Sequence, residues 1–173
     1  MIFTIGHSTH PIGRFLGLLS CHGVTLLVDV RRFPRSRRHP QFNRDSLGPS
    51  LAAAGIGYLH AEALGGMREP RPGSPNAAWR EPAFRAYADH TRTPEFLACL
   101  DELVRLARQH VLALMCAEAN PLECHRQLIA DALLARGLPV RHVLADGRVR
   151  DHQLTPFARV RSGVVTYPDL LSY

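Results

Sequence analysis

Short apolar runs that alternate with segments of helical periodicity are the feature that most constrains the fold of this chain. Three of these runs are nearly continuous, and they cover residues 1–5 (MIFTI), 24–30 (VTLLVDV) and 111–116 (VLALMC). Such runs are typical of strands that are buried on both faces, as in a parallel sheet. Two less regular segments, residues 56–66 and 139–147, are predicted to hold a further strand and the last strand.

Helices are predicted between the strands because apolar residues recur there at helical spacing. The segments with this spacing are residues 11–23, 44–55, 83–110 and 121–137. Strands that alternate with helices predict a single α/β domain over residues 1–173. The expected architecture is a mostly parallel sheet in a three-layer, Rossmann-like arrangement.

The charge of the chain is positive and unevenly distributed. The formal net charge is +6, the isoelectric point is about 9.8, and arginine supplies all 21 of the Lys and Arg positions. Residues 31–44 contain six arginines and no acidic residue. Such a run is either a solvated basic loop or a surface that contacts phosphates, because a guanidinium group binds phosphate through two parallel hydrogen bonds. The second interpretation predicts nucleic acid or a nucleotide as the partner.

The sequence gives no sign of a membrane partner or of export. No apolar stretch approaches the roughly 20 residues that a membrane-spanning helix needs. Residues 1–8 lack the basic region and the long apolar core of a signal peptide. We therefore expect a cytoplasmic protein whose four cysteines are reduced. The sequence leaves the oligomeric state open.

Polar or glycine residues follow four of the predicted strands at the point where each strand ends. They are His7 and Ser8, Asp29 and Arg31, the segment around Gly65 and Gly66, and Cys116 and Glu118. Ligands of open α/β sheets bind beyond the carboxyl ends of the strands. We therefore expect these residues to meet at one edge of the sheet and to form the functional site.

Residues 115–126 (MCAEANPLECHR) connect a predicted strand to a predicted helix. Asn120 is a suitable N-cap, Pro121 takes the first helical position, and Glu123 follows three residues after the cap. The helix is therefore predicted to begin at Pro121, with residues 124–126 in its first turns. This pattern gives Glu123 a structural role.

Four sequence blocks, in this order, resemble a known family. The blocks TIGHS, LVDVRRFPRSRRHPQFN, YLHAEALGG and CAEANPLECHRQLIA resemble the signature blocks of a widespread bacterial and archaeal family, domain of unknown function 488. The resemblance spans nearly the whole chain, but the family's name carries no assigned chemistry. The positions that it emphasises are Gly6, His7, Ser8, Asp29, Arg31, Pro34, Ser36, Phe42, Gly65, Gly66, Cys116, Glu118, Cys124, His125 and Arg126.

Three kinds of chemistry can be compared on these residues. A cysteine nucleophile like that of rhodaneses and cysteine phosphatases needs an arginine six residues later, and six residues after Cys116 the chain has Leu122. A zinc site of Cys116, Cys124 and His125 lacks the closely spaced ligand pairs typical of zinc, so zinc is a minor alternative and no cofactor is predicted. General acid–base chemistry is the preferred interpretation.

The leading hypothesis is a hydrolase that acts on nucleic acid or a nucleotide, with N-glycosidic cleavage, as in DNA repair, placed ahead of phosphoester hydrolysis. The predicted acid–base residues are Asp29, Glu118, His7 and His125. The predicted phosphate-binding residues are Ser8, Arg31, Arg35, Ser36, Arg37, Arg38, Phe42 and Arg126, and the candidate thiols are Cys116 and Cys124. Alternatively, Asp29 forms a buried ion pair with Arg31 or Arg126 that organises the sheet edge.

Two other functions stand beside this hypothesis. A non-catalytic nucleic-acid-binding or regulatory module would use the arginine run for phosphates and aromatic side chains for base stacking. The aromatic candidates are Phe33, Phe42, Tyr58 and Trp79, each of which could equally serve core or loop packing. A small-molecule enzyme would use a reactive thiol of Cys116 or Cys124.

Overall fold

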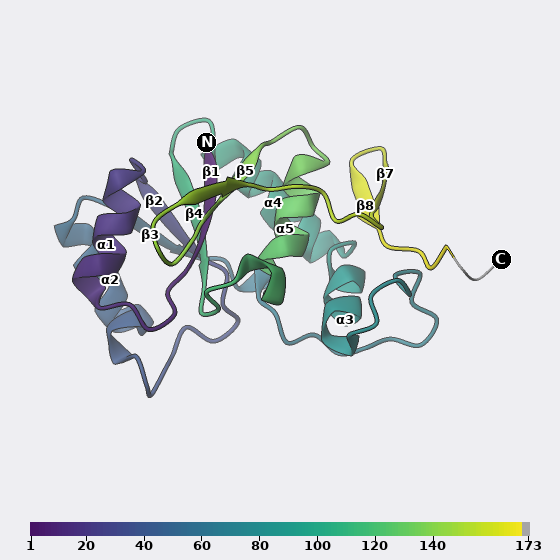
Figure 1. The fold of residues 1–173 in the computed structure, drawn as a ribbon, viewed down its shortest axis with the longest axis horizontal. Helices are drawn as coiled ribbons and strands as arrows, with labels where there is room; N and C mark the ends of the chain where they lie inside the picture. Colours follow the sequence, from purple (N-terminus) through teal and green to yellow (C-terminus); the bar gives the residue numbers. More distant parts are fainter. Residues whose placement is uncertain (171–173) are drawn as a thin grey trace.

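The sheet of the protein confirms the predicted α/β class. The computed structural model describes residues 1–170, in which six strands form one sheet in the order β3-β2-β4-β1-β5-β6 (Figure 1). The strands are β1 (Ile2–Gly6), β2 (Leu26–Asp29), β3 (Gly57–His60), β4 (Leu112–Cys116), β5 (Val140–Val143) and β6 (Val149–Asp151). The first five are parallel, and β6 pairs antiparallel with β5. Residues 171–173 of the predicted domain lie outside the described residues.

Helices cover both faces of the sheet, which gives three layers and a Rossmann-like arrangement (Figure 1). They are α1 (Ile12–Cys21), α2 (Arg44–Ala53), α3 (Pro82–His90), α4 (Pro94–Leu106) and α5 (Arg126–Leu134), with short 3₁₀ turns η1 (Pro40–Phe42), η2 (Glu62–Leu64) and η3 (Pro121–Glu123). α1 and α2 pack with Phe3 and Ile5 of β1. The other three helices pack with Ile2 of β1 and Leu114 of β4, on the opposite face. No helix within residues 1–170 combines the length and the apolar character needed to cross a membrane.

Two departures from the predicted elements have local causes. Residues 83–110 form two helices, because Thr93 caps α4 by accepting a hydrogen bond from the backbone N–H of Phe96 (3.3 Å) and Pro94 cannot continue α3. β5 is not the last strand, since β6 follows it and β7 (Arg159–Arg161) and β8 (Val164–Thr166) form a separate hairpin. These late strands have three residues each, and β6 and β7 are largely exposed, so there is little apolar periodicity to mark them.

The end of β1 lies against the segment after β4 with no room for a side chain. A Cβ atom added to Gly6 would lie 1.8 Å from the carbonyl oxygen of Glu118. One residue further on, the backbone N–H of His7 donates to the carbonyl of Cys116 (2.9 Å). Gly6 therefore allows the chain after β4 to pass directly over the end of β1, which brings the residues that follow both strands together.

We expect the Gly6→Ala substitution to lower the free energy of unfolding by at least about 2 kcal/mol, because the new methyl group overlaps a backbone carbonyl. Gly13→Ala is the matched control. Gly13 lies in α1 with nothing within 4 Å of an added Cβ, and alanine is the better helix former, so stability should rise by up to about 1 kcal/mol. Chemical denaturation of both variants measures the two effects. Equal stabilities would contradict the close contact at Gly6.

Candidate active site

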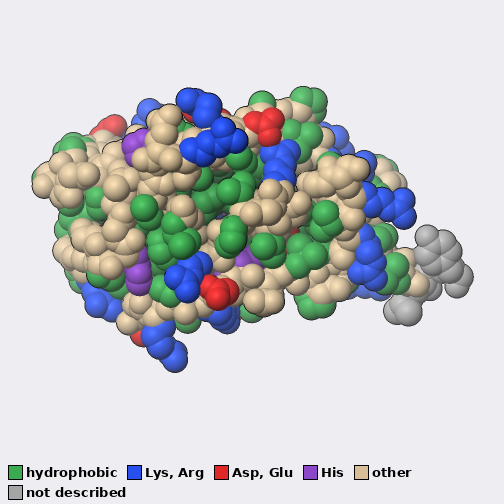
Figure 2. Space-filling view, turned by 90° about the horizontal axis from the view of Figure 1, so that it is seen from above, with side chains coloured by type: hydrophobic (Ala, Val, Ile, Leu, Met, Phe, Trp, Pro, Cys, Tyr) green, Lys and Arg blue, Asp and Glu red, His purple; other side chains and the backbone are tan. Residues whose placement is uncertain are grey.

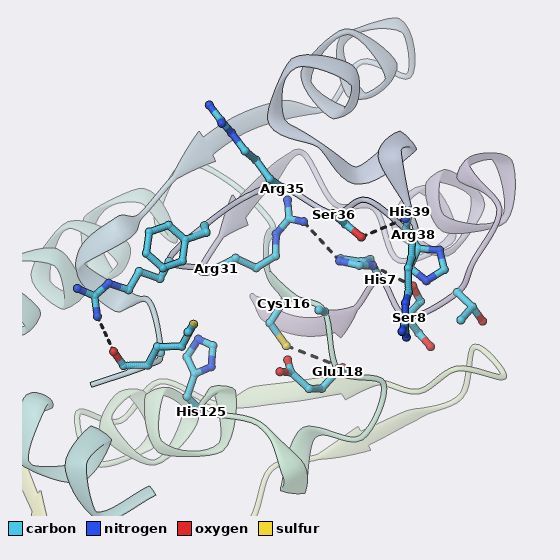
Figure 3. A pocket seen from close by; sticks show the side chains of 16 residues that line it. His7, Ser8, Arg31, Arg35, Ser36, Arg38, His39, Cys116, Glu118 and His125 are labelled. Carbon is cyan, nitrogen blue, oxygen red and sulfur yellow. Dashed lines mark hydrogen bonds between the residues drawn. The ribbon is translucent and has the colours of Figure 1, made fainter. Parts of the chain in front are cut away.

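The carboxyl ends of β1, β2 and β4 line a cavity of about 530 Å³ (Figure 3). β2 and β4 are direct neighbours and β1 is the next strand, so the residues that follow these strands meet here. The segment after β3 and η2 joins them through Gly66 and Met67. The lining residues are His7, Ser8, Thr9, Arg31, Arg32, Phe33, Arg35, Ser36, Arg38, His39, Gly66, Met67, Cys116, Ala117, Glu118 and His125. The predicted convergence of four strand ends is confirmed.

Asp29 and Arg31 form a buried ion pair beside the cavity. The Asp29 carboxylate is fully buried and accepts hydrogen bonds from Nε (2.9 Å) and Nη2 (2.6 Å) of Arg31. The backbone N–H of Arg31 (3.1 Å) and the hydroxyl of Tyr58 (2.8 Å) also donate to it. Asp29 does not line the cavity, whereas Arg31 does. The anticipated ion pair therefore forms with Arg31, and it fixes the position of that guanidinium group.

His7 is packed against Phe42 and is uncharged near neutral pH. The two rings stack with their centroids 4.3 Å apart, and Phe42 is fully buried outside the cavity lining. Nδ1 of His7 lies 2.9 Å from the carbonyl oxygen of Ser8 and therefore carries the proton, so Nε2 accepts from Nη1 of Arg31 (3.4 Å). Burial is the main cause that lowers the pKa of His7 from 6.5 to about 4, and the charge of Arg31 lowers it further.

The arginine-rich loop between β2 and α2 forms one wall of the cavity. Arg32, Arg35 and Arg38 line it, while Arg37 is exposed and lies outside the lining. Among the ion pairs of residues 1–170, none involves the three arginines of this wall. Arginine side chains also lie on the face shown in Figure 2, so positive charge is not confined to the cavity. The cavity nevertheless holds three guanidinium charges that pair with no carboxylate of residues 1–170.

Ser36 fixes the course of this loop. Its backbone N–H donates to Oδ1 of Asn43 (2.6 Å), and its hydroxyl oxygen accepts from the backbone N–H of His39 (3.0 Å). The arginines on either side of Ser36 are therefore carried on a backbone that is held at two points.

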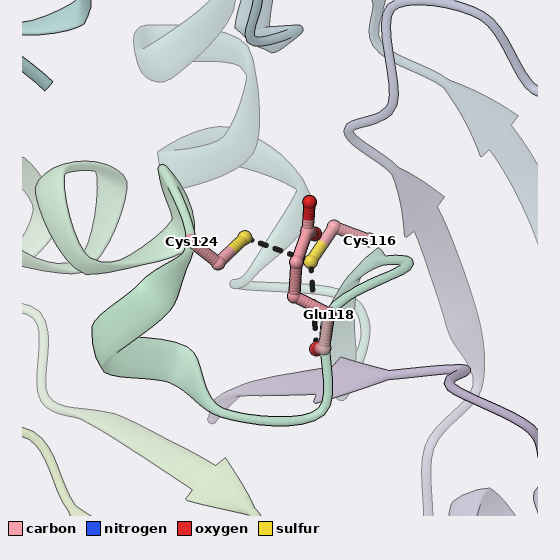
Figure 4. Close-up of side chains that lie close together, drawn as sticks. All are labelled: Cys116, Glu118 and Cys124. Carbon is pink, nitrogen blue, oxygen red and sulfur yellow. Dashed lines mark hydrogen bonds between the residues drawn. The ribbon is translucent and has the colours of Figure 1, made fainter. Parts of the chain in front are cut away.

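The segment between β4 and α5 differs from the prediction. α5 begins at Arg126 rather than at Pro121, and the Asn120 side chain caps only the 3₁₀ turn η3, where it accepts a backbone N–H (3.1 Å). Cys124 has an extended backbone (φ −136°, ψ 148°) that separates this turn from α5. Because of this break, the Sγ atom of Cys124 lies 2.8 Å from that of Cys116 (Figure 4).

Arg126 is fully buried at the start of α5 and ties this segment to β1. Its Nη2 donates to the carbonyl of Glu118 (2.5 Å) and its Nη1 to the hydroxyl oxygen of Thr4 (3.2 Å). Its Nε and its backbone N–H each lie 3.4 Å from the Sγ atom of Cys124. Arg126 is absent from the cavity lining, so this predicted phosphate ligand instead orders the protein behind the cavity.

The Cys124 sulfur lies among hydrogen-bond donors and positive charge. Burial favours the neutral thiol, but hydrogen bonds from Cys116 and His125 and the charge of Arg126 outweigh it and hold the pKa of Cys124 well below its ordinary value. Burial raises the pKa of Cys116, which keeps its proton. Burial opposes charge on His125 as well, yet the Cys124 sulfur, 3.6 Å from Nδ1, raises the pKa of His125. Nε2 of His125 donates to the carbonyl of Val30 (2.9 Å).

Glu118 carries the one carboxylate among the described residues that line the cavity. Its side chain is exposed, and within residues 1–170 its carboxylate makes no hydrogen bond or ion pair. A carboxylate oxygen lies within 4.8 Å of the sulfur atoms of both Cys116 and Cys124 (Figure 4), and these three groups could hold a metal ion. His125, the third ligand considered from the sequence, has its Nδ1 atom 3.6 Å from the Sγ atom of Cys124.

Most of the aromatic residues considered for base stacking serve the packing of the protein. Phe42 is buried against His7, and the Tyr58 hydroxyl supports the buried ion pair. Trp79 stacks on Phe84 with centroids 4.9 Å apart. Phe33 differs, because its side chain is 60% exposed and lines the cavity.

A buried polar chain behind the cavity carries no signal in the sequence. Thr4 accepts from Arg126, so its hydroxyl donates to Nδ1 of His142 (2.7 Å). Nε2 of His142 then donates to Nδ1 of His152 (2.9 Å), and Nε2 of His152 donates to the buried carboxylate of Asp131 (2.8 Å). Its members come from segments far apart along the chain, so no local motif could reveal it. The chain fixes the tautomers of both histidines and anchors Arg126.

We expect the His7 ring to stay neutral, with its proton on Nδ1, at every pH above about 4. Nitrogen–proton correlation spectra of the imidazole rings over this range measure the state, and the His7→Gln variant identifies the signals. Histidine in the unfolded chain binds a proton below about 6.5, so His7 makes the folded state lose stability as the pH falls from about 6.5 to about 4. A His7 ring that is protonated at a pH of about 6 would contradict this environment.

Comparison with known proteins identifies a family but no characterised relative. A sequence model of a family described as "Domain of unknown function DUF488" matches residues 11–133. No curated protein and no solved structure matches the chain. The match extends from α1 into α5 and includes the arginine-rich loop and both cavity cysteines. Because it covers more than half of the sequence, the chain belongs to the family domain of unknown function 488.

Proposed function

We propose that the protein is a hydrolase that cleaves the N-glycosidic bond of a nucleotide unit, with base excision from DNA as the favoured form of the reaction. The proposal rests on the charged side chains that line the cavity. One exposed carboxylate, Glu118, shares it with three arginines that have no carboxylate partner among the described ion pairs. A phosphate held by the arginines would leave the attached sugar within the same cavity as Glu118.

Phosphate is the ligand group that best fits the arginine-rich wall. Guanidinium groups bind phosphate oxygens through paired, charge-assisted hydrogen bonds. Arg31 is already neutralised by Asp29, so the uncompensated charge comes from Arg32, Arg35 and Arg38. Arg31 then orients the phosphate without adding net positive charge, because Asp29 holds its guanidinium group in one orientation. We assign Asp29 as a positioning residue and not as an acid–base group.

The carboxylate of Glu118 suits the chemistry of a glycosidic bond. Cleavage of such a bond develops positive charge on the sugar, and a carboxylate stabilises that charge or activates the attacking water. Asp29 cannot take this part, because it is fully buried and accepts hydrogen bonds from Arg31 and Tyr58. Glu118 has neither constraint, since its side chain is exposed toward the cavity.

The two histidines predicted as acid–base groups, His7 and His125, are not free for phosphoester chemistry. Hydrolysis of a phosphoester without a metal would need a histidine that is free to move a proton. Both ring nitrogens of His7 are engaged, by Ser8 and Arg31, and both of His125 are engaged, by Cys124 and Val30. The two histidines therefore serve to position their neighbours, which leaves His39 as the cavity histidine whose ring makes no hydrogen bond within residues 1–170.

The direct test uses end-labelled single- and double-stranded oligonucleotides that carry normal, deaminated, oxidised or alkylated bases. We expect strand cleavage at one kind of base only after treatment with hot alkali, because excision of a base leaves an alkali-labile site. Glu118→Gln should lower the rate by about 100-fold or more, as expected for loss of a catalytic carboxylate. Denaturing gels measure both effects.

Glu123→Gln is the matched control for this assay. It removes the same charge from the same segment, but Glu123 does not line the main cavity, so the rate should be unchanged. Cleavage without alkali would indicate phosphoester hydrolysis instead. An equal rate in Glu118→Gln and the unaltered protein would contradict the role of Glu118.

Binding of DNA should depend on salt through the cavity arginines. We expect Arg38→Ala to reduce the slope of log affinity against log salt concentration by about 0.7 to 0.9, the value for one lost phosphate contact. Arg108→Ala is the control, because Arg108 is exposed beside Met1 and Ile2, at the start of β1 and away from the cavity. Fluorescence anisotropy with a labelled oligonucleotide measures the slopes. The same slope for both variants would contradict binding of phosphate in the cavity.

A further inference from the structure

The sulfur atoms of Cys116 and Cys124 lie 2.8 Å apart, in a hydrogen bond that the Cys116 thiol donates to the Cys124 sulfur (Figure 4). A disulfide bond is about 2.05 Å long, so a shift of less than about 1 Å would join them. We propose that this pair is a redox modification site, at which a hydroperoxide converts the two thiols into a disulfide that a dithiol reductant reopens. The inference does not depend on the proposed hydrolase activity, because the state of the two sulfurs can be measured directly.

The geometry favours a bond between the sulfurs over a shared metal ion. Two thiolates on one zinc ion, each at about 2.3 Å in tetrahedral geometry, would lie about 3.8 Å apart, which is farther than the sulfurs are here. The Arg126 side chain also places a positive charge 3.4 Å from the Cys124 sulfur. A cation in that position disfavours a second cation and stabilises a thiolate.

Small molecules can reach the pair from two sides. Cys116 contributes to the lining of the main cavity, and Cys124 contributes to a neighbouring cavity of about 130 Å³. A water molecule takes up about 30 Å³ of liquid, so the smaller cavity has room for hydrogen peroxide. Both cysteines are nearly inaccessible to larger reagents, with exposures of 1% and 2%. The site therefore selects small peroxides by size.

The two sulfurs have different parts in the reaction. Cys124 is the attacking group, because the backbone N–H and Nε of Arg126 and the Nδ1 atom of His125 all surround its sulfur. The Cys124 thiolate attacks one peroxide oxygen, which forms sulfenic acid and releases hydroxide, and the hydroxide takes up the proton that the thiol had lost. The Cys116 thiol then attacks the sulfenic sulfur and expels water. In sum, two thiols and one hydrogen peroxide give one disulfide and two water molecules.

The positions of the arginines let one tryptic peptide report the redox state of both cysteines. The chain has no lysine, so trypsin leaves Cys116 and Cys124 together on the peptide of residues 109–126, while Cys21 and Cys99 fall on other peptides. We would treat the full chain with a small excess of hydrogen peroxide, unfold it in denaturant, alkylate the remaining thiols, digest with trypsin and measure the masses of the peptides. The peptide 109–126 should lose two hydrogen atoms in mass and take up no alkylating agent. Reduction by dithiothreitol before alkylation should restore two alkylated sites.

Single variants test the order of the two sulfurs. In Cys116→Ser the sulfenic acid of Cys124 has no partner, so dimedone should trap it on that residue when the peroxide-treated chain is unfolded in the presence of dimedone. In Cys124→Ser, dimedone should not label Cys116, which lacks the surrounding donors. Cys21 is exposed and serves as an internal reference for a thiol without such neighbours.

Three results would overturn the proposal. One is a peptide 109–126 that stays reduced at a peroxide dose that oxidises Cys21. Another is oxidation of Cys116 or Cys124 to sulfinic acid with no disulfide formed. The third is zinc that co-purifies at one ion per chain and protects both thiols from peroxide. The unaltered protein alone distinguishes these outcomes, so the test holds even if the serine variants do not fold.

Discussion

The buried guanidinium group of Arg126 is the interaction on which the rest of the site depends. It joins the Glu118 backbone, Thr4 of β1 and the sulfur of Cys124 at one point. Burying such a charge costs several kcal/mol unless it is paired and hydrogen-bonded, and here the Cys124 thiolate and two oxygen acceptors offset that cost. Arg126 holds the backbone carbonyl of Glu118, which lies directly against Gly6. The side chain of Glu118 therefore points into the cavity.

The charged groups of the site fall into two sets with different tasks. Arg31 and Arg126 are buried, and each has an anionic partner, Asp29 and Cys124 respectively. These pairs make the sheet edge rigid, which is what a preorganised site requires. The arginines of the loop from residue 32 to 38 are less buried and have no carboxylate partner within residues 1–170, so they are available to an external anion. The two buried pairs thus support the loop arginines, which we propose bind the substrate.

The sequence is sufficient to predict the strands β1, β2 and β4 and the meeting of their ends, because continuous apolar runs and parallel pairing follow simple rules. It does not distinguish Asp29 from Glu118, since both are acidic residues near strand ends. Only tertiary contacts do so: Tyr58 and Arg31 enclose Asp29, whereas Glu118 stays open. The sequence also does not reveal where α5 starts. The capping pattern at Asn120 belongs to a 3₁₀ turn, and the extended backbone of Cys124, whose sulfur contacts that of Cys116, separates this turn from α5.

The central claim is that Glu118 stabilises positive charge on a sugar whose phosphate the arginines hold. The most direct test compares two oligonucleotides, one with a cationic pyrrolidine in place of the sugar of an abasic site and one with the neutral tetrahydrofuran analogue. We predict that the unaltered protein binds the cationic oligonucleotide at least about tenfold more tightly, because a catalytic site favours the charge of its transition state. The preference should vanish in Glu118→Gln. Equal affinity of the unaltered protein for the two oligonucleotides would contradict the account.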